Sequence, residues 1–348
     1  MGARDVARAI DALRRGWPVA LGDISFLAIE TADEAGLAFF DGAEAPASLL
    51  ISGNRAATLK LTNQREAEPA GPVLIRRAPW IDLAMANAIA DPALDLSQPF
   101  KGPFQAGPLY SPETARAALR LARLAGLLPA VFTRRDGPAE ARAEMADVMT
   151  FGSGADLHIV SRARLPNRFA EQGEIVAFRS DGDTAEHVAL LIGAPNGQAP
   201  LVRVHSECLT GDVLGSLKCD CGPQLAAALE AIAASGWGIL LYLRQEGRSI
   251  GLVNKLRAYA LQDQGFDTVD ANLRLGFADD ERDFSVAARM LERLGQTRIR
   301  MLTNNPRKVA ALEGVGIQVT ERVPLKAGAG AHNQAYLDTK RDRSGHQL

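Results

Sequence analysis

The sequence is poor in cysteine and aromatic residues and has no long apolar run. Only three cysteines occur in 348 residues, and all lie between positions 208 and 221. An odd, clustered set excludes a disulfide framework and favours metal binding or catalysis. The three tryptophans show no pattern for stacking the bases of single-stranded nucleic acid. No run of about 20 apolar residues is present, so we expect no membrane-spanning helix.

Charge of either sign is also not in excess. Lys and Arg number 39 and Asp and Glu 41, so the net charge is −2. No global field therefore attracts nucleic acid, although a local basic pocket for one phosphorylated ligand remains compatible with this balance. The first residues lead into an amphipathic helix pattern rather than the apolar segment of a signal peptide, and we expect a cytoplasmic protein.

Alternating helix and strand patterns predict an α/β fold in two domains, with mixed sheets and flanking helices. The predicted helices span 5–15, 82–91, 112–127, 138–149, 222–235 and 250–264, and the predicted strands span 19–21, 128–132, 174–179, 187–192, 202–205 and 239–243. A basic, loop-like stretch at 162–168 suggests the boundary, giving domains 1–165 and 166–348. The tail from Ala327 is rich in glycine and then charged, so we expect it to be mobile.

The cysteines follow the spacing Cys208-x10-Cys219-x-Cys221. Three thiolates leave the fourth position of a zinc ion open for water, which is typical of catalytic sites. His205 lies close enough in sequence to complete a closed structural site, and three ordinary buried cysteines are a further alternative. The adjoining Glu207 favours catalysis, because a carboxylate can position a metal-bound water or accept its proton.

Two polar segments follow predicted strands further along the chain. Arg244-Gln245-Glu246-Gly247-Arg248 comes after a buried strand, where ligands bind in α/β folds, and its arginines suit phosphate oxygens. In the segment from Met301 to Lys308, backbone N–H groups, Thr303 and Lys308 could cradle a phosphate. Each segment alone is equally compatible with a plain solvated loop or a strand–helix connection.

Together these segments resemble the GTP cyclohydrolase II family over about residues 170 to 348. The motifs that carry the resemblance are Arg203-Val204-His205-Ser206-Glu207-Cys208-Leu209-Thr210-Gly211-Asp212, Cys219-Asp220-Cys221-Gly222, Arg244 to Arg248, Tyr259-Ala260-Leu261, Asp267-Thr268-Val269, Asp280-Glu281-Arg282-Asp283-Phe284, Leu302 to Pro306, Tyr336 to Lys340 and Gly345-His346.

The resemblance implies a role for each matching residue. Cys208, Cys219 and Cys221 would hold a catalytic zinc ion. Asp280 would accept a proton, Arg282 would act as nucleophile, and Tyr259 would orient the chemistry at the zinc. The residues implied to bind GTP are Arg203, Val204, His205, Ser206, Glu207, Gln224, Glu246, Gly247, Arg248, Thr268, Thr303 and Lys308. A guanidinium stays protonated and is a poor nucleophile, so Arg282 could instead stabilise charge on the α-phosphate.

The implied reaction opens the imidazole ring of GTP and is the first step of riboflavin biosynthesis. Its products are formate, pyrophosphate and 2,5-diamino-6-ribosylamino-4(3H)-pyrimidinone 5′-phosphate. Mg²⁺ on the phosphates would assist cleavage between the α and β phosphorus atoms. The resemblance also implies a homodimer. Two other functions stay open: a non-catalytic nucleotide-binding regulatory protein on this scaffold, and a related zinc hydrolase of another nucleotide.

The N-terminal half more faintly resembles 3,4-dihydroxy-2-butanone 4-phosphate synthase, at 7–19 and 121–127. That family has an acid-rich metal loop after its first strand and a His before a later helix. Here Gly22-Asp23-Ile24-Ser25-Phe26 and Pro112-Glu113-Thr114 occupy those places. We therefore expect this half to have no synthase activity and to serve a structural or regulatory role.

Overall fold

The structure is a computed structural model that describes residues 2–43, 45–68, 70–154, 156–180, 185–328, 330 and 333–344. The chain divides into two compact units. The N-terminal unit contains residues 1–151 and 250–281, and the cysteine unit contains residues 152–249 and 282–348. The predicted α/β class with two sheet-containing domains is confirmed. The domain boundary predicted at 165/166 stays a prediction.

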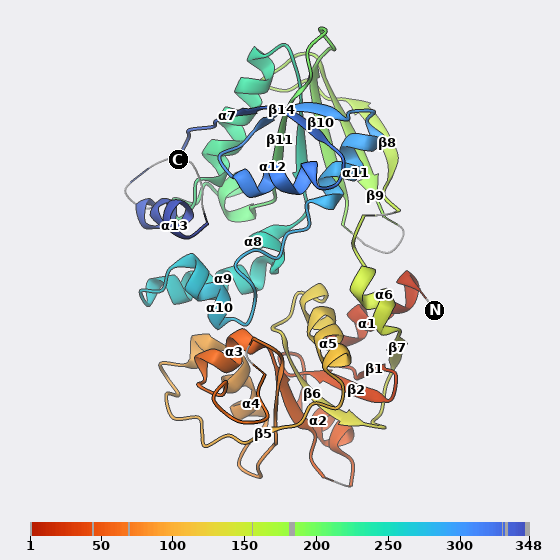
Figure 1. Ribbon diagram of the computed structural model, residues 1–348, viewed down its shortest axis with the longest axis vertical. Coiled ribbons are helices and arrows are strands. Elements are labelled where there is room, and N and C mark those ends of the chain that lie inside the picture. The colour runs from red at the N-terminus through yellow and green to blue at the C-terminus, as the bar shows by residue number, and fades with distance from the viewer. Residues whose placement is uncertain are drawn as a thin grey trace. The chain divides into compact units, whose positions relative to one another are not determined.

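The N-terminal unit is built on a seven-stranded sheet covered by helices (Figure 1). In spatial order the strands are β5 (Ala106–Gly107), β4 (Val73–Ile75), β3 (Ser48–Ile51), β6 (Ala130–Arg135), β2 (Ile24–Ala28), β1 (Val19–Leu21) and β7 (Ala141–Ala143). One core contains α1 (Ala3–Arg14), α5 (Pro112–Leu124) and α6 (Met145–Thr150). The other contains α2 (Glu34–Asp41), α3 (Gly53–Thr58), α4 (Leu83–Ala90), α9 (Gly251–Asp263) and α10 (Thr268–Arg274).

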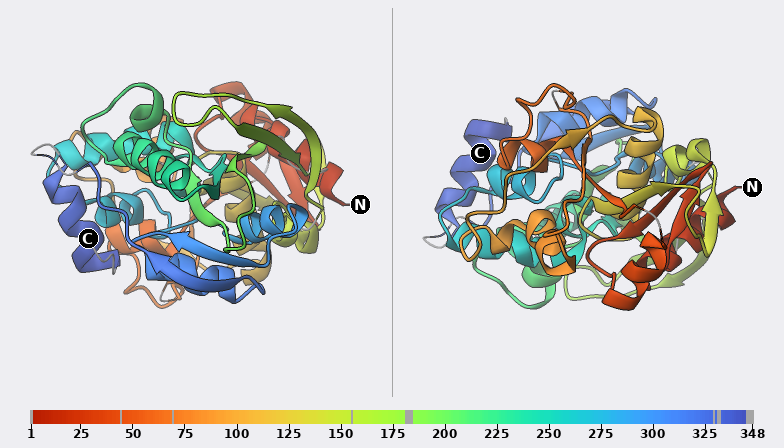
Figure 2. Two further views of the ribbon diagram at one scale, coloured as in Figure 1. Left: turned by 90° about the horizontal axis from the view of Figure 1, so that it is seen from above. Right: turned by 90° about the horizontal axis from the view of Figure 1, so that it is seen from below.

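The cysteine unit has its own seven-stranded sheet, whose helices can be followed in Figure 2. In spatial order its strands are β14 (Gln318–Val323), β13 (Arg298–Leu302), β11 (Leu201–Ser206), β12 (Trp237–Leu243), β10 (His187–Gly193), β9 (Gly173–Arg179) and β8 (His158–Arg164). One core holds α7 (Cys221–Ala234), and the other holds α11 (Ser285–Arg293) and α12 (Pro306–Glu313). Two short elements, η2 (Leu209–Val213) and α8 (Glu246–Ser249), and the helix α13 (Gln334–Ser344) complete the unit.

Strand alternation explains why helices cover both faces of this second sheet. Leu201 and Leu240 face the core that contains α7, whereas Val202, Ile239 and Leu241 face the core that contains α11. Strands buried on both faces need continuous apolar runs, as in Ile239 to Leu243. β11 pairs in parallel with β12 and β13, so the carboxyl ends of these three strands meet at one edge.

Two sequence predictions are wrong in detail. The predicted helix 138–149 begins only at Met145, because Ala141–Ala143 forms β7 and pairs in parallel with β1. The basic stretch predicted as a loop is partly β-strand, since β8 runs to Arg164 and pairs with β9. The other predicted helices and strands correspond to elements of the structure.

The tail from Ala327 is only partly described. Its mobility stays a prediction, and Gly345-His346 lie outside the described residues. Within the described ranges, no helix has the length and apolar character needed to cross a membrane.

Candidate metal centre and nucleotide site

The predicted segments of the cysteine unit lie where three parallel strands end. Cys208 follows β11, Glu246 follows β12, and Thr303 follows β13. In α/β sheets this edge is where ligands bind, because the loops beyond the strands converge there. The connection from β11 to β12 passes through α7 on one face, and α11 precedes β13 on the other. The loops therefore diverge beside β11, which opens space for a site.

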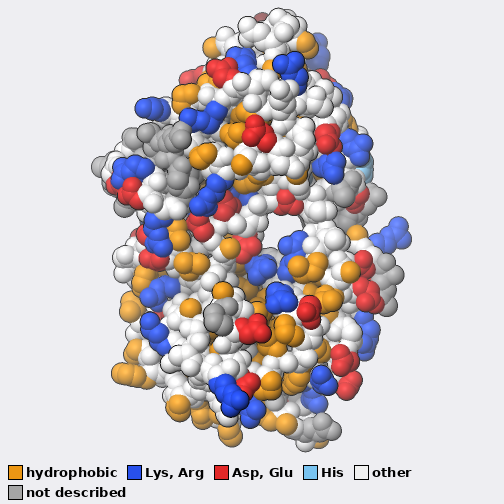
Figure 3. Space-filling view, viewed as in Figure 1, with side chains coloured by type: hydrophobic (Ala, Val, Ile, Leu, Met, Phe, Trp, Pro, Cys, Tyr) orange, Lys and Arg blue, Asp and Glu red, His pale blue; other side chains and the backbone are white. Residues whose placement is uncertain are grey.

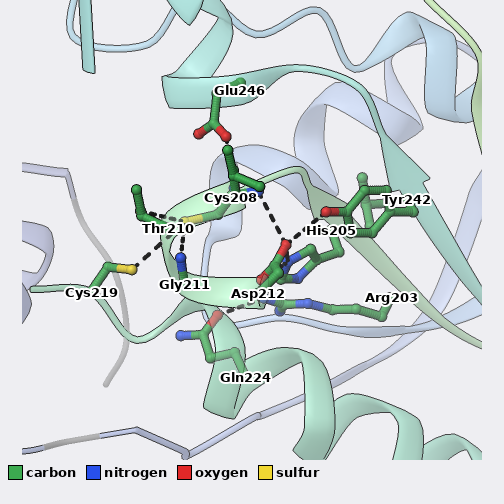
Figure 4. A network of polar contacts seen from close by, with 12 residues as sticks. Arg203, His205, Cys208, Thr210, Gly211, Asp212, Cys219, Gln224, Tyr242 and Glu246 are labelled. Atoms are coloured by element: carbon green, nitrogen blue, oxygen red, sulfur yellow. Dashed lines mark hydrogen bonds and ion pairs between the residues drawn. The ribbon is translucent and has the colours of Figure 1, made fainter. Parts of the chain in front are cut away.

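The three cysteines come together at this edge, and Figure 4 shows two of them, Cys208 and Cys219. Their sulfur atoms all lie within 4.8 Å of one another, and the Sγ atoms of Cys208 and Cys219 are 3.7 Å apart. Zn–S bonds of about 2.3 Å in a tetrahedron place two sulfurs about 3.8 Å apart. Cys208 and Cys219 are buried and Cys221 is half-buried. The spacing therefore fits a metal ion held by three thiolates.

Gly211 provides the room for this arrangement. A Cβ at Gly211 would lie 2.8 Å from Cys219 Sγ and 3.0 Å from Cys208 Sγ, so a side chain would collide with both sulfurs. The Gly211 N–H donates to Cys208 Sγ at 3.3 Å, which stabilises a thiolate there. The backbone of η2 thus passes directly beside the candidate ligands.

Without a metal ion, the thiols share protons among themselves. Hydrogen bonding with Cys208 raises the pKa of Cys219, and burial adds to this effect. Hydrogen bonding with Cys208 and Cys219, together with burial, raises the pKa of Cys221 well above its ordinary value. A metal ion binds cysteine as thiolate, so its binding here must displace the protons that these raised pKa values retain.

Behind the cysteines, Asp212 accepts hydrogen bonds from three directions. The partners of its carboxylate are His205 Nε2 at 3.1 Å, the Tyr242 hydroxyl at 2.9 Å and the Cys208 N–H at 3.1 Å. The sequence alone gave Asp212 no role beyond its place in the family motif and gave Tyr242 none. The available signal was Tyr242 as the one polar residue in the apolar run Ile239 to Leu243.

A second buried group, Arg203, lies beneath the cysteine loop. Its guanidinium donates to Gln224 Oε1 at 2.6 Å and to the Leu302 carbonyl at 3.2 Å. Burial lowers the pKa of Arg203 to about 10. Among the described residues, its Nε and the Oγ of Ser206 have no hydrogen-bond partner although both atoms are buried. Buried polar atoms without partners mark a place where a ligand can complete the hydrogen bonding.

The segment after β12 fixes the other side of the cysteine loop. Glu246 accepts from the Leu209 N–H at 2.7 Å and from the Gly247 N–H at 2.9 Å. Arg244 pairs with Glu207 at 2.8 Å. Gly247 and Arg248 both adopt left-handed backbone angles, with φ of 62°. Such strain in a non-glycine residue costs free energy and is concentrated at functional sites.

Two predicted cationic residues converge on one aromatic ring. The Arg282 guanidinium carbon lies 5.2 Å from the Phe284 ring centroid, and Lys308 Nζ lies 5.3 Å from it. Lys308 is 6% exposed and donates to the Val204 carbonyl at 3.0 Å, while Thr303 is also buried. On the face drawn in Figure 3 acidic and basic side chains are interspersed. Two cations therefore contact the Phe284 ring, to which the sequence alone gave no role.

Three predicted residues belong to the N-terminal unit instead. Tyr259 lies in α9, where Lys255 Nζ is 5.8 Å from its ring centroid. Thr268 begins α10 and accepts a hydrogen bond from Gln262 at 3.0 Å. Asp280 lies in the segment between α10 and the end of that unit at residue 281. The other predicted site residues, from Arg203 to Lys308, belong to the cysteine unit.

Comparison with known proteins gives consistent matches. The model of a family described as GTP cyclohydrolase II matches residues 158–324. A GTP cyclohydrolase-2 of Azotobacter vinelandii is 59% identical over 190 residues, which cover 54% of this chain and 91% of that protein. A GTP cyclohydrolase-2 of Azospirillum brasilense is 42% identical over 370 residues, covering 99% and 94%.

Two further matches cover more than two thirds of the chain. The riboflavin biosynthesis protein RibBA of Rhodococcus erythropolis is 46% identical over 272 residues, covering 70% of this chain and 64% of that protein. A solved structure described as RibBX, a two-domain 3,4-dihydroxy-2-butanone 4-phosphate synthase from A. baumannii, covers 92% of this chain and 99% of its own, at 18% identity and a TM-score of 0.34.

Fold and site together define an α/β protein whose three-thiol cluster can hold a metal ion beside buried cations. The relatives narrow this class to one family. Because relatives at 42% and 59% identity are matched over more than nine-tenths of their length, the chain belongs to the GTP cyclohydrolase II family. It is thereby a member of an enzyme family of riboflavin biosynthesis.

Proposed function

We propose that the chain hydrolyses GTP to formate, pyrophosphate and 2,5-diamino-6-ribosylamino-4(3H)-pyrimidinone 5′-phosphate, as a zinc-dependent GTP cyclohydrolase II. The observation that carries the proposal is the cluster of three thiols within 4.8 Å of one another, in a chain of this family. When bound there, zinc supplies a Lewis acid with an open coordination position for water. Magnesium accompanies the GTP phosphates.

The buried cations of the cysteine unit support binding of the triphosphate. Arg203 has an unpartnered buried Nε, and Lys308 lies at the start of α12, where N–H groups also favour anions. The guanidinium of Arg248 suits phosphate oxygens through its fork of donors. The backbone from Val204 to Glu207, with Gln224, Glu246, Gly247 and Thr303, lines the rest of the nucleotide site.

The chemical roles follow the family motif. Asp280 accepts a proton, and Tyr259 orients the reacting groups. Arg282 acts on the α-phosphate, where its permanent charge stabilises the leaving pyrophosphate better than it serves as a nucleophile. Thr268 contributes to GTP binding. The protein works in the cytoplasm as a homodimer. Sedimentation at low and high protein concentration tests the dimer, because it measures the mass of the particle.

The decisive experiment incubates zinc-loaded protein with GTP and Mg²⁺ and measures formate and pyrophosphate together. Equimolar release of both supports the proposal. GTP binding without either product would instead indicate a non-catalytic nucleotide-binding protein. Turnover of another purine or pyrimidine nucleotide in preference to GTP would indicate the related zinc hydrolase. A Cys219→Ser variant is the matched control, because it removes one thiolate and should abolish release of both products.

A further inference from the structure

The carboxylate of Asp212 holds together the two strands that lead into the metal cluster. His205 on β11 and Tyr242 on β12 stand directly opposite each other in the parallel register. Their rings stack at 5.6 Å between centroids, with 19° between planes. Both point toward Asp212, as Figure 4 shows, so one carboxylate accepts from both strands. Rigid neighbouring strands give this arrangement a fixed geometry.

The third donor connects this group to the metal cluster. The Cys208 N–H donates to Asp212 at 3.1 Å, and the Asp212 N–H donates back to the Cys208 carbonyl at 2.7 Å. Two hydrogen bonds therefore fix the backbone of the residue that bears the first thiol. The position of that thiol relative to Cys219 depends on this backbone, since the side chain of cysteine has only one torsion before the sulfur.

Burial makes the arrangement costly to disturb. The side chains of His205 and Asp212 are only 4% and 3% exposed. A buried carboxylate requires several donors, and removing its charge or its partners leaves the remaining polar groups unsatisfied. The His205 imidazole is directed at Asp212, so the contribution of the Val204–Glu207 segment to nucleotide binding comes from other atoms. Groups behind metal ligands tune metal affinity through such contacts.

We propose that Asp212, held by His205 and Tyr242, is a positioning group that presets the Cys208 thiolate for zinc. It touches neither the metal nor GTP and acts only through the backbone of Cys208. The inference rests on the proposed zinc-dependent function, because it concerns how the zinc ligand is placed. It assigns a role to Asp212 and Tyr242 and a second role to His205.

The test measures zinc affinity by competition with a chromogenic chelator, in Asp212→Asn and Tyr242→Phe variants. Asp212→Asn keeps the shape but presents an amide to three donors, and we expect zinc affinity to fall roughly 10- to 100-fold. Tyr242→Phe leaves the carboxylate in place and should lower the affinity by a smaller factor. Replacing zinc with cobalt should show altered thiolate-to-metal absorption in both variants. Glu292→Gln, in an exposed ion pair of the same unit, is the control.

The outcomes separate this inference from the proposed function. Wild-type zinc affinity and an unchanged cobalt spectrum in both variants would overturn the positioning role, even if their metal-free forms melt at lower temperature. That pattern would show a merely structural contribution. A wild-type chain that binds zinc but does not hydrolyse GTP would refute the proposed function and leave the positioning result valid. A wild-type chain that binds no zinc would overturn both.

Discussion

The backbone of Gly211 passes so close to Cys219 that a Cβ on Gly211 would lie 2.8 Å from the Cys219 sulfur. The same Cβ would lie 2.9 Å from Cys221 Cβ and 3.0 Å from Cys208 Sγ. One added methyl group would thus contact all three candidate ligands at once. Glycine is required here by space, since its backbone angle is one that other residues adopt.

Gly211→Ala should therefore prevent stoichiometric zinc binding. The methyl group displaces at least two sulfurs, and misplaced thiolates cannot complete the coordination. Metal content after purification, measured by inductively coupled plasma mass spectrometry, checks this. Gly330→Ala is the matched control, because among the described residues the nearest atom to a Cβ there would be Asn333 Oδ1, at 3.9 Å. A fully zinc-loaded Gly211→Ala protein would show that the loop yields without cost.

Chelation should expose every thiol of the protein at once. The only cysteines in the sequence are the three of the cluster, so a thiol reagent reports on this site alone. Zinc-loaded protein should react slowly, and addition of a strong chelator should increase the reaction rate of all three thiols of the chain. If the three thiols react with the reagent at the same rate before and after chelation, the cluster does not bind the metal.

Zinc affinity should rise with pH. Hydrogen bonding within the cluster and burial raise the pKa of Cys219 and Cys221 above their ordinary value in the metal-free chain. Metal binding must displace these protons, so binding strengthens as pH rises and weakens as pH falls. The expected slope is up to about tenfold per pH unit for each proton displaced. Zinc titrations between pH 6 and 8, in two buffers of different ionisation enthalpy, measure both affinity and proton release.

Phe284→Leu should weaken turnover of GTP. The ring lies 5.2 Å from the Arg282 guanidinium carbon and 5.3 Å from Lys308 Nζ, and each cation–π contact is worth about 0.5–1 kcal/mol. Loss of both should lower kcat/KM by roughly 5- to 30-fold. Phe169→Leu is the control. The Arg168 guanidinium carbon lies 4.6 Å from the Phe169 ring centroid, so this variant also loses a cation–π contact, but neither residue belongs to the predicted site. Equal kinetics for the Phe284 variant and the wild type would exclude a role for this ring.

The N-terminal unit should not form dihydroxybutanone phosphate from ribulose 5-phosphate and Mg²⁺. The segment Gly22 to Phe26 contains one acid, Asp23, in place of an acid-rich metal loop, and Ile24 and Phe26 within it belong to a buried strand. The same sample must hydrolyse GTP, which shows that the chain is folded. Any dihydroxybutanone phosphate above the rate of a heat-denatured sample would overturn this prediction.

Local sequence signals predicted most of the secondary structure and the metal cluster. Ser111 caps α5 by accepting from the Thr114 N–H at 3.2 Å, and Pro112 occupies the first turn, so the helix predicted from 112 has a local signal for its start. The cysteines were informative because their scarcity left few alternatives. The helix predicted at 138–149 failed because pairing of Ala141–Ala143 with β1, more than 100 residues away, overrides local propensity.

The remaining errors and omissions concern contacts between distant segments. Nothing in the sequence shows that Asp212 and Tyr242, which lie 30 positions apart, form a hydrogen bond with each other. Likewise, the sequence does not show that Tyr259, Thr268 and Asp280 group with residues 1–151, as they do in the structure. A one-dimensional pattern gives the identity of such residues but not the unit with which they fold.

That assignment of residues 250–281 has a consequence for how the chain can be divided. Ile250, Leu261 and Phe277 are buried in the same core as Leu49 and Phe132, while both ends of the segment continue into the cysteine unit. Deleting residues 1–151 would strip this insertion of its apolar surroundings. A single cut in the sequence therefore cannot separate the two units of this chain, because residues 250–281 group with residues 1–151.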